Sequence, residues 1–430
     1  MTTNTHTPDP SGGPVDTAPV AKDAVTAVDP RLLVREEGLQ GYLKEFGRKL
    51  RGGDLGALPV VVGIAVIWAI FQWKDDAFLS PKNLSDLSIL ITGTGLISVG
   101  IVFVLLLGEI DLSVGSVSGL AAAILAVLNI NHGVPEGIAV LTALAAGAVL
   151  GALHGFFFAK IGVPAFVVTL AGLLAWNGLM LQVLGTTGTI GIDDDSFVRS
   201  LTAHYFTDIA AAYGAATVAV VGFFLAQFLD SRRRAAVGIP SRPLAEILVR
   251  TAVLAILAYA AAWKLNEYKG LPLAFVIFLV VLVFFDFLVR RTSYGRKVIA
   301  LGGSVEAARR AGINVAAIRI SVFAIAGFMA ASGGLIIASK TASASQQAGT
   351  GNLLMEAIAA AVIGGTSLFG GRGSVWSALL GMLVIGSISS GMNLLGVSNS
   401  IQYMITGAVL LAAVVIDSVS RRTQRSAGRG

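Results

Sequence analysis

The sequence predicts an all-α protein, a polytopic transmembrane bundle of about 12 helices, some of them broken, with both termini in the cytoplasm. The mean hydropathy of the 430 residues is +0.80, and only 13% of them are charged, whereas a soluble domain averages about 25% charged residues. Several apolar runs reach the roughly 20 residues that a helix needs to cross a bilayer. Most Lys and Arg residues lie between these runs, where they can set the orientation of the spans.

The composition excludes several classes of function. The net charge of +6 comes mainly from Lys and Arg in the predicted loops, so it does not indicate nucleic-acid binding. The chain has no cysteine, which excludes a disulfide framework and a thiolate metal site. The four histidines are scattered without an i, i+4 pair, so we expect no metal site and no cofactor.

The amino-terminal region divides into two segments before the first long apolar run. Residues 1–30 are rich in Thr, Pro, Asp, Gly and Ala and lack aromatic residues, which predicts a disordered cytoplasmic tail. Residues 31–56 predict an amphipathic interfacial helix, and an ordinary solvated linker is the alternative. The helix is indicated by apolar residues that recur on one helical face, namely Leu39, Leu43, Phe46 and Leu50.

Residues 57–417 form the predicted transmembrane domain. The candidate spans are 57–73, 84–107, 114–130, 137–160, 164–184, 207–229, 244–264, 271–289, 316–339, 354–368, 374–396 and 399–417. The run 354–368 is compatible with a full crossing or with a broken, re-entrant segment.

The distribution of positive charge predicts the orientation of these spans. If both termini are cytoplasmic, the inside segments carry 22 Lys and Arg residues and the outside segments carry 6. This asymmetry favours a cytoplasmic location for the loops 230–243 and 290–315 and for the tail 418–430.

The most polar long interruption of the hydrophobic sequence is 292–313. Residues 305–310 predict a short helix in which Ser304 is the N-cap. Gly312 ends this helix, as glycine does just beyond a helix terminus. A short capped helix between two membrane spans suits docking onto a soluble partner.

The order of residues in this loop resembles the cytoplasmic coupling loop of ABC-importer permeases of the ribose/xylose/galactose class. A basic loop that merely obeys the positive-inside rule would explain the charges but not the Gly, Ala and Glu spacing. The matching positions are Gly295, Arg296, Ala300, Leu301, Gly302, Gly303, Ser304, Glu306, Ala307, Ala308, Arg309, Ala311, Gly312 and Ile313. The resemblance implies coupling to an ATPase through Gly295, Arg296, Glu306, Ala307, Ala308, Arg309, Gly312 and Ile313.

A second motif, at 108–116, places Glu109 and Asp111 within about thirty otherwise apolar residues. An Asp at the centre of a membrane helix costs about 2.5–3.5 kcal/mol, so such a residue usually faces a polar cavity or a partner. We expect a helix break, with Ser113 as the cap of a helix that starts near Val114. The same sugar permeases carry a similar motif, and the Glu109 variant resembles their xylose-type branch. Asp111 and Ser113 are therefore candidates either for the transport path or for a purely structural break.

A third motif begins at Glu356 and continues through a glycine-rich run to Ser374. Glycines here permit tight turns and close helix contacts. The sugar permeases carry a close relative of this run, which adds Gly370, Gly371 and Arg372 to the candidate path or helix-break residues. No Gly-x-x-x-x-Gly-Lys-(Ser/Thr) occurs in the chain, so we expect a transport subunit that is not an enzyme and has no ATPase motif of its own.

The resemblance covers roughly residues 84–417. The extra pair of spans at 207–229 and 244–264 exceeds the ribose-type pattern and occurs in xylose-type members. The resemblance as a whole implies a multi-pass permease in a prokaryotic cell membrane. This permease would carry a monosaccharide, with a xylose-like pentose as the first candidate. The implied partners are a cytoplasmic ATP-binding subunit, an extracytoplasmic sugar-binding protein, a second permease copy and membrane lipid.

Two other functions stay open at the level of sequence. An ion-coupled secondary transporter would use buried carboxylates such as Glu109, Asp111, Asp286 or Glu356. A related ABC permease would carry branched-chain amino acids or another small solute. A neutral sugar needs hydroxyl and amide partners along its path. The candidates for such a lining are Asn177, Gln182, Ser387, Asn393 and Gln402. Hydrogen bonding between helices is the alternative role for each of these side chains.

Overall fold

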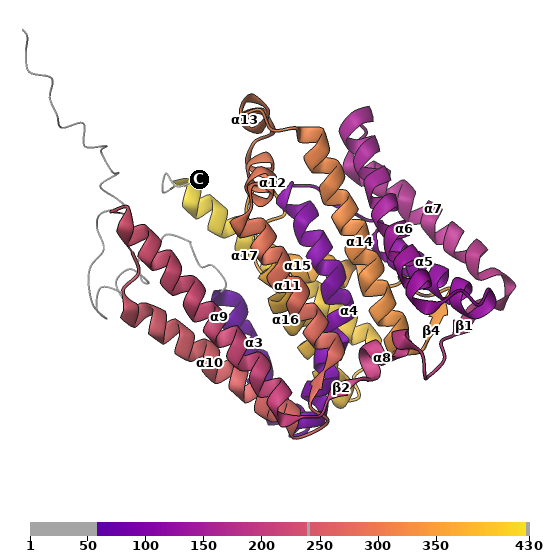
Figure 1. The fold of residues 1–430 in the computed structure, drawn as a ribbon, viewed down its shortest axis with the longest axis horizontal. Coiled ribbons are helices and arrows are strands. Elements are labelled where there is room, and N and C mark those ends of the chain that lie inside the picture. The colour runs from indigo at the N-terminus through magenta and orange to yellow at the C-terminus, as the bar shows by residue number, and fades with distance from the viewer. Residues whose placement is uncertain (1–57, 239–240, 427–430) are drawn as a thin grey trace, which may run out of the picture.

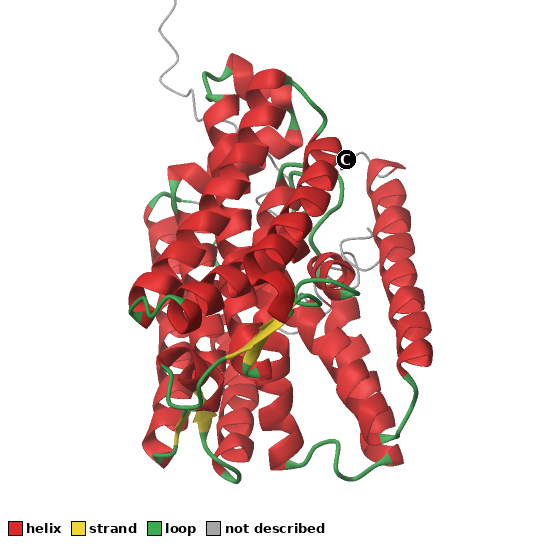
Figure 2. Ribbon diagram, turned by 90° about the vertical axis from the view of Figure 1, so that its right-hand side faces the viewer, coloured by secondary structure: helices red, strands yellow, loops and turns green. Residues whose placement is uncertain are grey.

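The computed structural model describes residues 58–238 and 241–426, so the predicted tail 1–30 and interfacial helix 31–56 lie outside the described residues. Long helices run alongside one another and make up most of the described chain (Figures 1 and 2). The helices are α3 (Leu58–Lys74), α4 (Pro81–Leu106), α5 (Val114–Ala126), α6 (Glu136–Phe156), α7 (Ala165–Leu184), α8 (Phe197–Ala203), α9 (Ile209–Ala236), α10 (Leu244–Asn266), α11 (Leu273–Arg291), α12 (Ser293–Gly303), α13 (Val305–Arg310), α14 (Val315–Thr341), α15 (Leu353–Ile363), α16 (Trp376–Leu394) and α17 (Asn399–Ser426). Single π-helical turns extend α5 to Asn131 and α6 to Ile161.

The apolar helices match the predicted runs in position, but not all of them have the length of a full crossing. Among the residues that the structure describes, nine helices are long and apolar enough to span a membrane. Three shorter apolar helices accompany them, at Leu58–Lys74, Leu353–Ile363 and Asn399–Val415. A polytopic helical bundle is therefore confirmed, and the count of twelve crossings stays a prediction.

Helix α4 lies at the centre of the bundle and is almost completely buried. It packs against α14, α11, α15 and α16, as expected for a helix that is apolar on all faces. A Cβ atom at Gly100 would lie 3.0 Å from the Cα atom of Ala326 on α14. Small residues at such crossings let two helix backbones approach closely within the membrane.

The crossing of α6 and α14 depends on glycine in the same way. A Cβ atom at Gly151 would lie 2.1 Å from the carbonyl oxygen of Phe323, and one at Gly327 would lie 2.1 Å from that of Gly147. Both obstacles are backbone atoms, which cannot rotate away. Any larger residue at these positions would force α6 and α14 apart.

Four short strands depart from the expected all-α fold. Strand β1 (Thr189–Gly191) pairs antiparallel with β4 (Ser343–Ser345), and β2 (Tyr205–Phe206) pairs antiparallel with β3 (Leu271–Pro272). Each strand has two or three residues, too few for an alternating pattern to be visible in the sequence. Their role is to fix the ends of the loops that connect the helices.

Helices α9 and α10 form a hairpin beside the main bundle (Figure 1, lower left). They pack chiefly against each other and bury few residues, and a hydrogen bond of 2.8 Å joins the hydroxyls of Thr217 and Tyr259. Their outer surfaces are apolar; the side chain of Val218, for example, is 73% exposed. This is the exposure expected of helices that face lipid.

Candidate functional site

Helix α13 forms as the sequence predicts. Its N-cap is Ser304, whose side chain accepts a hydrogen bond from the backbone of the helix. Gly312 follows the helix with a φ angle of +77°. The backbone N–H of Ile313 donates to the carbonyl of Ala308 at 3.1 Å, and that of Gly312 donates to Arg309. These two bonds form a Schellman motif, which requires the left-handed conformation that glycine adopts most readily.

The exposed face of α13 points away from the bundle, at the end of the molecule opposite to β2 (Figure 1). Glu306, Ala307 and Arg309 are exposed, and Glu306 and Arg309 form an ion pair of 3.4 Å. Ala308, in contrast, is only 3% exposed and packs into the core of its own chain. A partner on this face would therefore touch Ala307 rather than Ala308.

Helix α12 was not predicted, although it carries part of the motif at 292–313. The hydroxyl of Thr292 accepts a hydrogen bond from the N–H of Gly295 and caps the helix. Gly295, Val298 and Leu301 are buried at a spacing of three residues, a signal that could have identified the helix. A Cβ atom at Gly295 would lie 2.0 Å from the carbonyl oxygen of Val289, so only glycine fits this turn. Arg296 is exposed.

Tyr294 joins α12 to the start of α14. Its hydroxyl is hydrogen-bonded to Ser321 at 2.9 Å. Burial raises the pKa of Tyr294, and the bond to Ser321 partly offsets this effect. The phenol therefore stays neutral at physiological pH and holds the two helices together without a charge.

The structure brings the three sequence motifs together at this end of the bundle. Gly302 of α12 lies directly against the end of α4, since a Cβ atom there would be 1.7 Å from the carbonyl oxygen of Leu106. The same carbonyl accepts a hydrogen bond of 3.0 Å from the N–H of Gly371. The segment 292–313, the end of α4 and the glycine-rich loop therefore share one contact.

Glycines with positive φ angles make this contact possible. The φ angles of Gly108, Gly370 and Gly371 are +80°, +81° and +71°. A Cβ atom at Gly370 would lie 2.7 Å from the carbonyl oxygen of Gly302. The side chain of Arg372 is exposed beside this loop.

Asp111 lies in the predicted break, between the end of α4 and the start of α5. It is 1% exposed, and its Oδ1 atom accepts hydrogen bonds from the backbone N–H of Ser113 at 2.8 Å and from the Ser113 hydroxyl at 2.6 Å. Ser113 stands at the N-cap position, but its hydroxyl makes no capping bond to α5. The position of the cap and the start of the helix at Val114 are therefore as expected, but the capping bond is absent, because the backbone of Ser113 is helical rather than extended.

Two residues that the sequence did not single out continue this network. The Ser113 hydroxyl lies 3.2 Å from Nδ1 of His154, and the indole N–H of Trp176 donates to Nε2 of His154 at 2.8 Å. Because an indole N–H is only a donor, Nε2 must be the acceptor and a neutral His154 must carry its proton on Nδ1. The chain of bonds therefore runs from Trp176 on α7 through His154 and Ser113 to Asp111. No local signal in the sequence joins residues this far apart.

Glu109 and Glu356 do not join this network. Glu109 is half-buried in the loop after α4; burial raises its pKa, and the charge of Arg319 opposes the shift. The guanidinium of Arg319 lies 4.2 Å from the ring centroid of Phe158. Glu356 is half-buried in the first turn of α15, and no ion pair involving it occurs within 58–238 and 241–426. The structure thus separates the predicted carboxylates into different environments.

Several predicted polar lining residues instead bond to other parts of the protein. The indole of Trp68 donates to the Ser387 hydroxyl at 2.9 Å, and the side chain of Gln402 donates to Asn393 at 2.7 Å. Gln182 is exposed. The side-chain oxygen of Asn177 is buried and has no hydrogen-bond partner in the described part of the chain.

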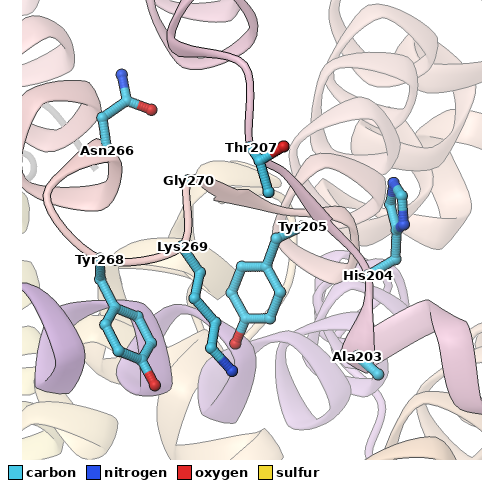
Figure 3. Close-up of a pocket in the computed structure, with 8 residues that line it drawn as sticks. All are labelled: Ala203, His204, Tyr205, Thr207, Asn266, Tyr268, Lys269 and Gly270. Carbon is cyan, nitrogen blue, oxygen red and sulfur yellow. The ribbon is translucent and has the colours of Figure 1, made fainter.

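A pocket at the base of the α9–α10 hairpin lies at the other end of the molecule from α13. Lys269 reaches between two tyrosines, and its Nζ atom is 5.4 Å from the ring centroids of both Tyr205 and Tyr268 (Figure 3). The complete lining is Ala203, His204, Tyr205, Thr207, Asn266, Tyr268, Lys269 and Gly270. None of the three motifs contributes to this pocket.

Comparison with known proteins defines the class to which this helical bundle belongs. Residues 83–414 match the family described as the branched-chain amino acid transport system / permease component. The chain belongs to this family of membrane permeases. No solved structure matches it.

The chain is also similar to individual sugar permeases over most of its length. It is 37% identical to the xylose transport system permease protein of Escherichia coli K12, over 87% of this chain and 94% of the relative. It is 36% identical to the corresponding protein of Haemophilus influenzae, over 87% of this chain and 99% of the relative. The ribose import permease protein of Bacillus subtilis is 31% identical, over 85% of this chain and 94% of the relative.

Proposed function

We propose that this chain is the permease subunit of an ABC importer that translocates a monosaccharide, with a xylose-like pentose as the preferred substrate. The observation that carries the proposal is the capped helix α13, which presents an exposed face next to the point where three motifs meet. The similarity to xylose and ribose permeases supports a sugar as the cargo. The protein is a multi-pass protein of a bacterial plasma membrane.

In this proposal the permease performs no chemistry of its own. A cytoplasmic ATPase binds α13, and its movement displaces α12 through the rigid turn at Gly295. Gly302 transmits the displacement to Leu106 and Gly371, because these backbones are already in contact and cannot be compressed. The break between α4 and α5 and the glycine-rich loop then move together and change access to the transport path.

The proposed assembly contains two permease copies, an ATP-binding subunit and an extracytoplasmic sugar-binding protein, all embedded in or next to lipid. The proposed topology has twelve crossings with both termini in the cytoplasm. Within it, 57–417 is the permease domain, 290–315 is the coupling loop and 418–430 is a cytoplasmic tail. Residues 1–30 and 31–56 serve as a disordered tail and an interfacial helix.

Reconstitution into proteoliposomes tests the proposal. The permease, its ATPase and its binding protein should together take up pentose only when ATP is supplied, whereas the permease alone should take up none under a proton or sodium gradient. Gradient-driven uptake by the permease alone would instead identify an ion-coupled transporter. A screen of ligands against the binding protein would identify the sugar. Binding of an amino acid instead would indicate an ABC permease for amino acids.

The structure engages two of the four carboxylates named for the ion-coupled alternative, whereas Glu109 and Glu356 are half-buried and stay candidates for it. Such a transporter needs carboxylates that can bind and release a cation. Asp286 is paired with Arg290 at 2.7 Å, and Asp111 is engaged by the two bonds from Ser113.

A further inference from the structure

The chain between α14 and α15 contains a non-helical stretch, 343–352, that extends into the bundle. It begins with β4 and then lies against the first two turns of α5. A Cβ atom at Gly119 would be 2.2 Å from the carbonyl oxygen of Ala348, and one at Gly349 would be 1.9 Å from that of Gly115. The backbones of the stretch and of α5 are therefore in direct contact.

This contact lies far from the carboxyl end of α5. The helix continues, through its π-helical turn, as far as Asn131. At 1.5 Å per residue, Gly119 and Gly115 are about 18 and 24 Å along the helix from that end. The following helix α15 has only 11 residues, a length of about 16 Å against the roughly 30 Å of a bilayer core. The part of the stretch that follows β4, residues 346–352, therefore lies within the thickness of the membrane rather than in an outer loop.

The stretch is polar, and part of it is exposed. Gln346, Gln347 and Thr350 are exposed. The side-chain amides of Gln346, Gln347 and Asn352 form no hydrogen bond with other residues in the described chain, and the Thr350 hydroxyl donates to the carbonyl of Gln347 at 2.7 Å. Irregular backbone with unsatisfied polar side chains is not tolerated against lipid tails, but it is tolerated where it lines a water-filled cavity. This face therefore meets water or another protein surface and not lipid.

We propose that Gln347, Thr350 and Asn352 line the transport path and contact the sugar as it crosses. The proposal rests on the proposed function and names the part of the permease that meets the cargo. Amide and hydroxyl groups offer donors and acceptors together, which is what an array of neutral sugar hydroxyls requires. Glu356 follows Asn352 by one helical turn, and its carboxylate adds acceptors at the inner end of the stretch. Broken helices of this kind surround the substrate site in other transporters.

The absence of cysteine from the sequence permits a direct test. Gln347→Cys and Thr350→Cys, each assembled with the ATPase and binding protein in proteoliposomes, are treated with a hydrophilic, membrane-impermeant thiol reagent. Both should react, and pentose with ATP should slow the reaction. Val218→Cys is the matched control, because Val218 is 73% exposed on the apolar surface of α9 and should not react from the aqueous phase. Lack of reaction at 347 and 350 would overturn the proposal.

A second measurement separates contact with sugar from a structural role. Gln347→Ala should raise the KM for pentose about tenfold, as expected for the loss of a hydrogen bond to the substrate, while leaving the maximal rate and the ATPase activity near wild type. An unchanged KM would overturn the proposed contact with sugar. Disulfide cross-linking of two Gln347→Cys copies without labelling would also overturn it and would assign the stretch to the interface between copies. If the wild type itself shows no ATP-driven uptake, the proposed function fails, whatever the cysteines report.

Discussion

At the scale of single residues, the most informative group is the carboxylate of Asp111. It is buried and ionisable, yet it accepts both of its hydrogen bonds from Ser113, only two residues away. Two substitutions at this position separate the effect of the carboxylate charge from that of the two hydrogen bonds. An asparagine keeps an oxygen acceptor in the same position, and an alanine keeps neither property.

Asp111→Asn should accumulate as folded protein at close to the wild-type level but should take up sugar about fivefold more slowly. Hydrogen bonds to a charged acceptor are about 1 kcal/mol stronger than neutral ones, so the break is held less firmly without the charge. Asp111→Ala should instead lower the folded yield, because two buried donors of Ser113 lose their acceptor at about 1–3 kcal/mol each. Size-exclusion chromatography and ATP-driven uptake measure the two effects. Normal uptake by Asp111→Asn would show that the charge has no role.

A second residue-scale prediction concerns the contact between α12 and α4. Gly302→Ala should destabilise the permease by about 1–3 kcal/mol, because the new methyl group meets backbone atoms that cannot move aside. The nearest obstacle is the carbonyl oxygen of Leu106, at 1.7 Å. Gly303→Ala is the matched control, since no atom lies within 4 Å of its added Cβ. The apparent melting temperature in detergent should fall for Gly302→Ala but not for Gly303→Ala. Equal melting temperatures for the two variants would show that the close approach of α12 to α4 does not contribute to stability.

The sequence revealed some of these residues but not how they are arranged. Asp111 stands out because a carboxylate among apolar residues has a recognisable cost. Its link to His154 and Trp176 could not be predicted, since it depends on how α5, α6 and α7 pack. The inward orientation of Ala308 was missed for the same reason.

At the scale of elements, the two neighbouring alanines of α13 separate docking from folding. Ala307→Trp should leave the folded yield unchanged and release the ATPase, because Ala307 is exposed on the outer face of the helix. Ala308→Trp should lower the folded yield, because a side chain that is 3% exposed has no room to grow. Co-purification of the ATPase with each variant provides the measurement. Retention of the ATPase at wild-type levels by Ala307→Trp would exclude this face as the docking site.

Elements with strong local signals were predicted well. The cap at Ser304 and the stop at Gly312 define α13, and long apolar runs define the main spans. Helix α12 was missed because its glycines and basic residues obscure three buried positions, and the strands are too short to produce a pattern. For the run 354–368 the sequence did not decide between a full crossing and a re-entrant segment. In the structure its helix α15 ends at Ile363, and a glycine-rich turn follows.

At the scale of the whole molecule, the orientation in the membrane is the property to test. Asp194→Cys should react with an impermeant thiol reagent in intact cells, whereas Arg233→Cys should react only after the cells are opened. Both positions are exposed in the structure: Asp194 lies between β1 and α8, and Arg233 lies in the last turn of α9. The charge distribution assigns them to opposite sides of the membrane. Labelling of Arg233→Cys in intact cells would reverse the proposed topology.

The pairing of β2 with β3 has a consequence for how this permease can change over evolution. Phe206 and Leu271 lie opposite each other in that pair, so the chain leaves and re-enters the bundle at nearly the same point. The α9–α10 hairpin thus begins and ends at the same end of the bundle. A lineage can gain or lose it as a unit, because two crossings added together leave the sidedness of α13, and of every later segment, unchanged.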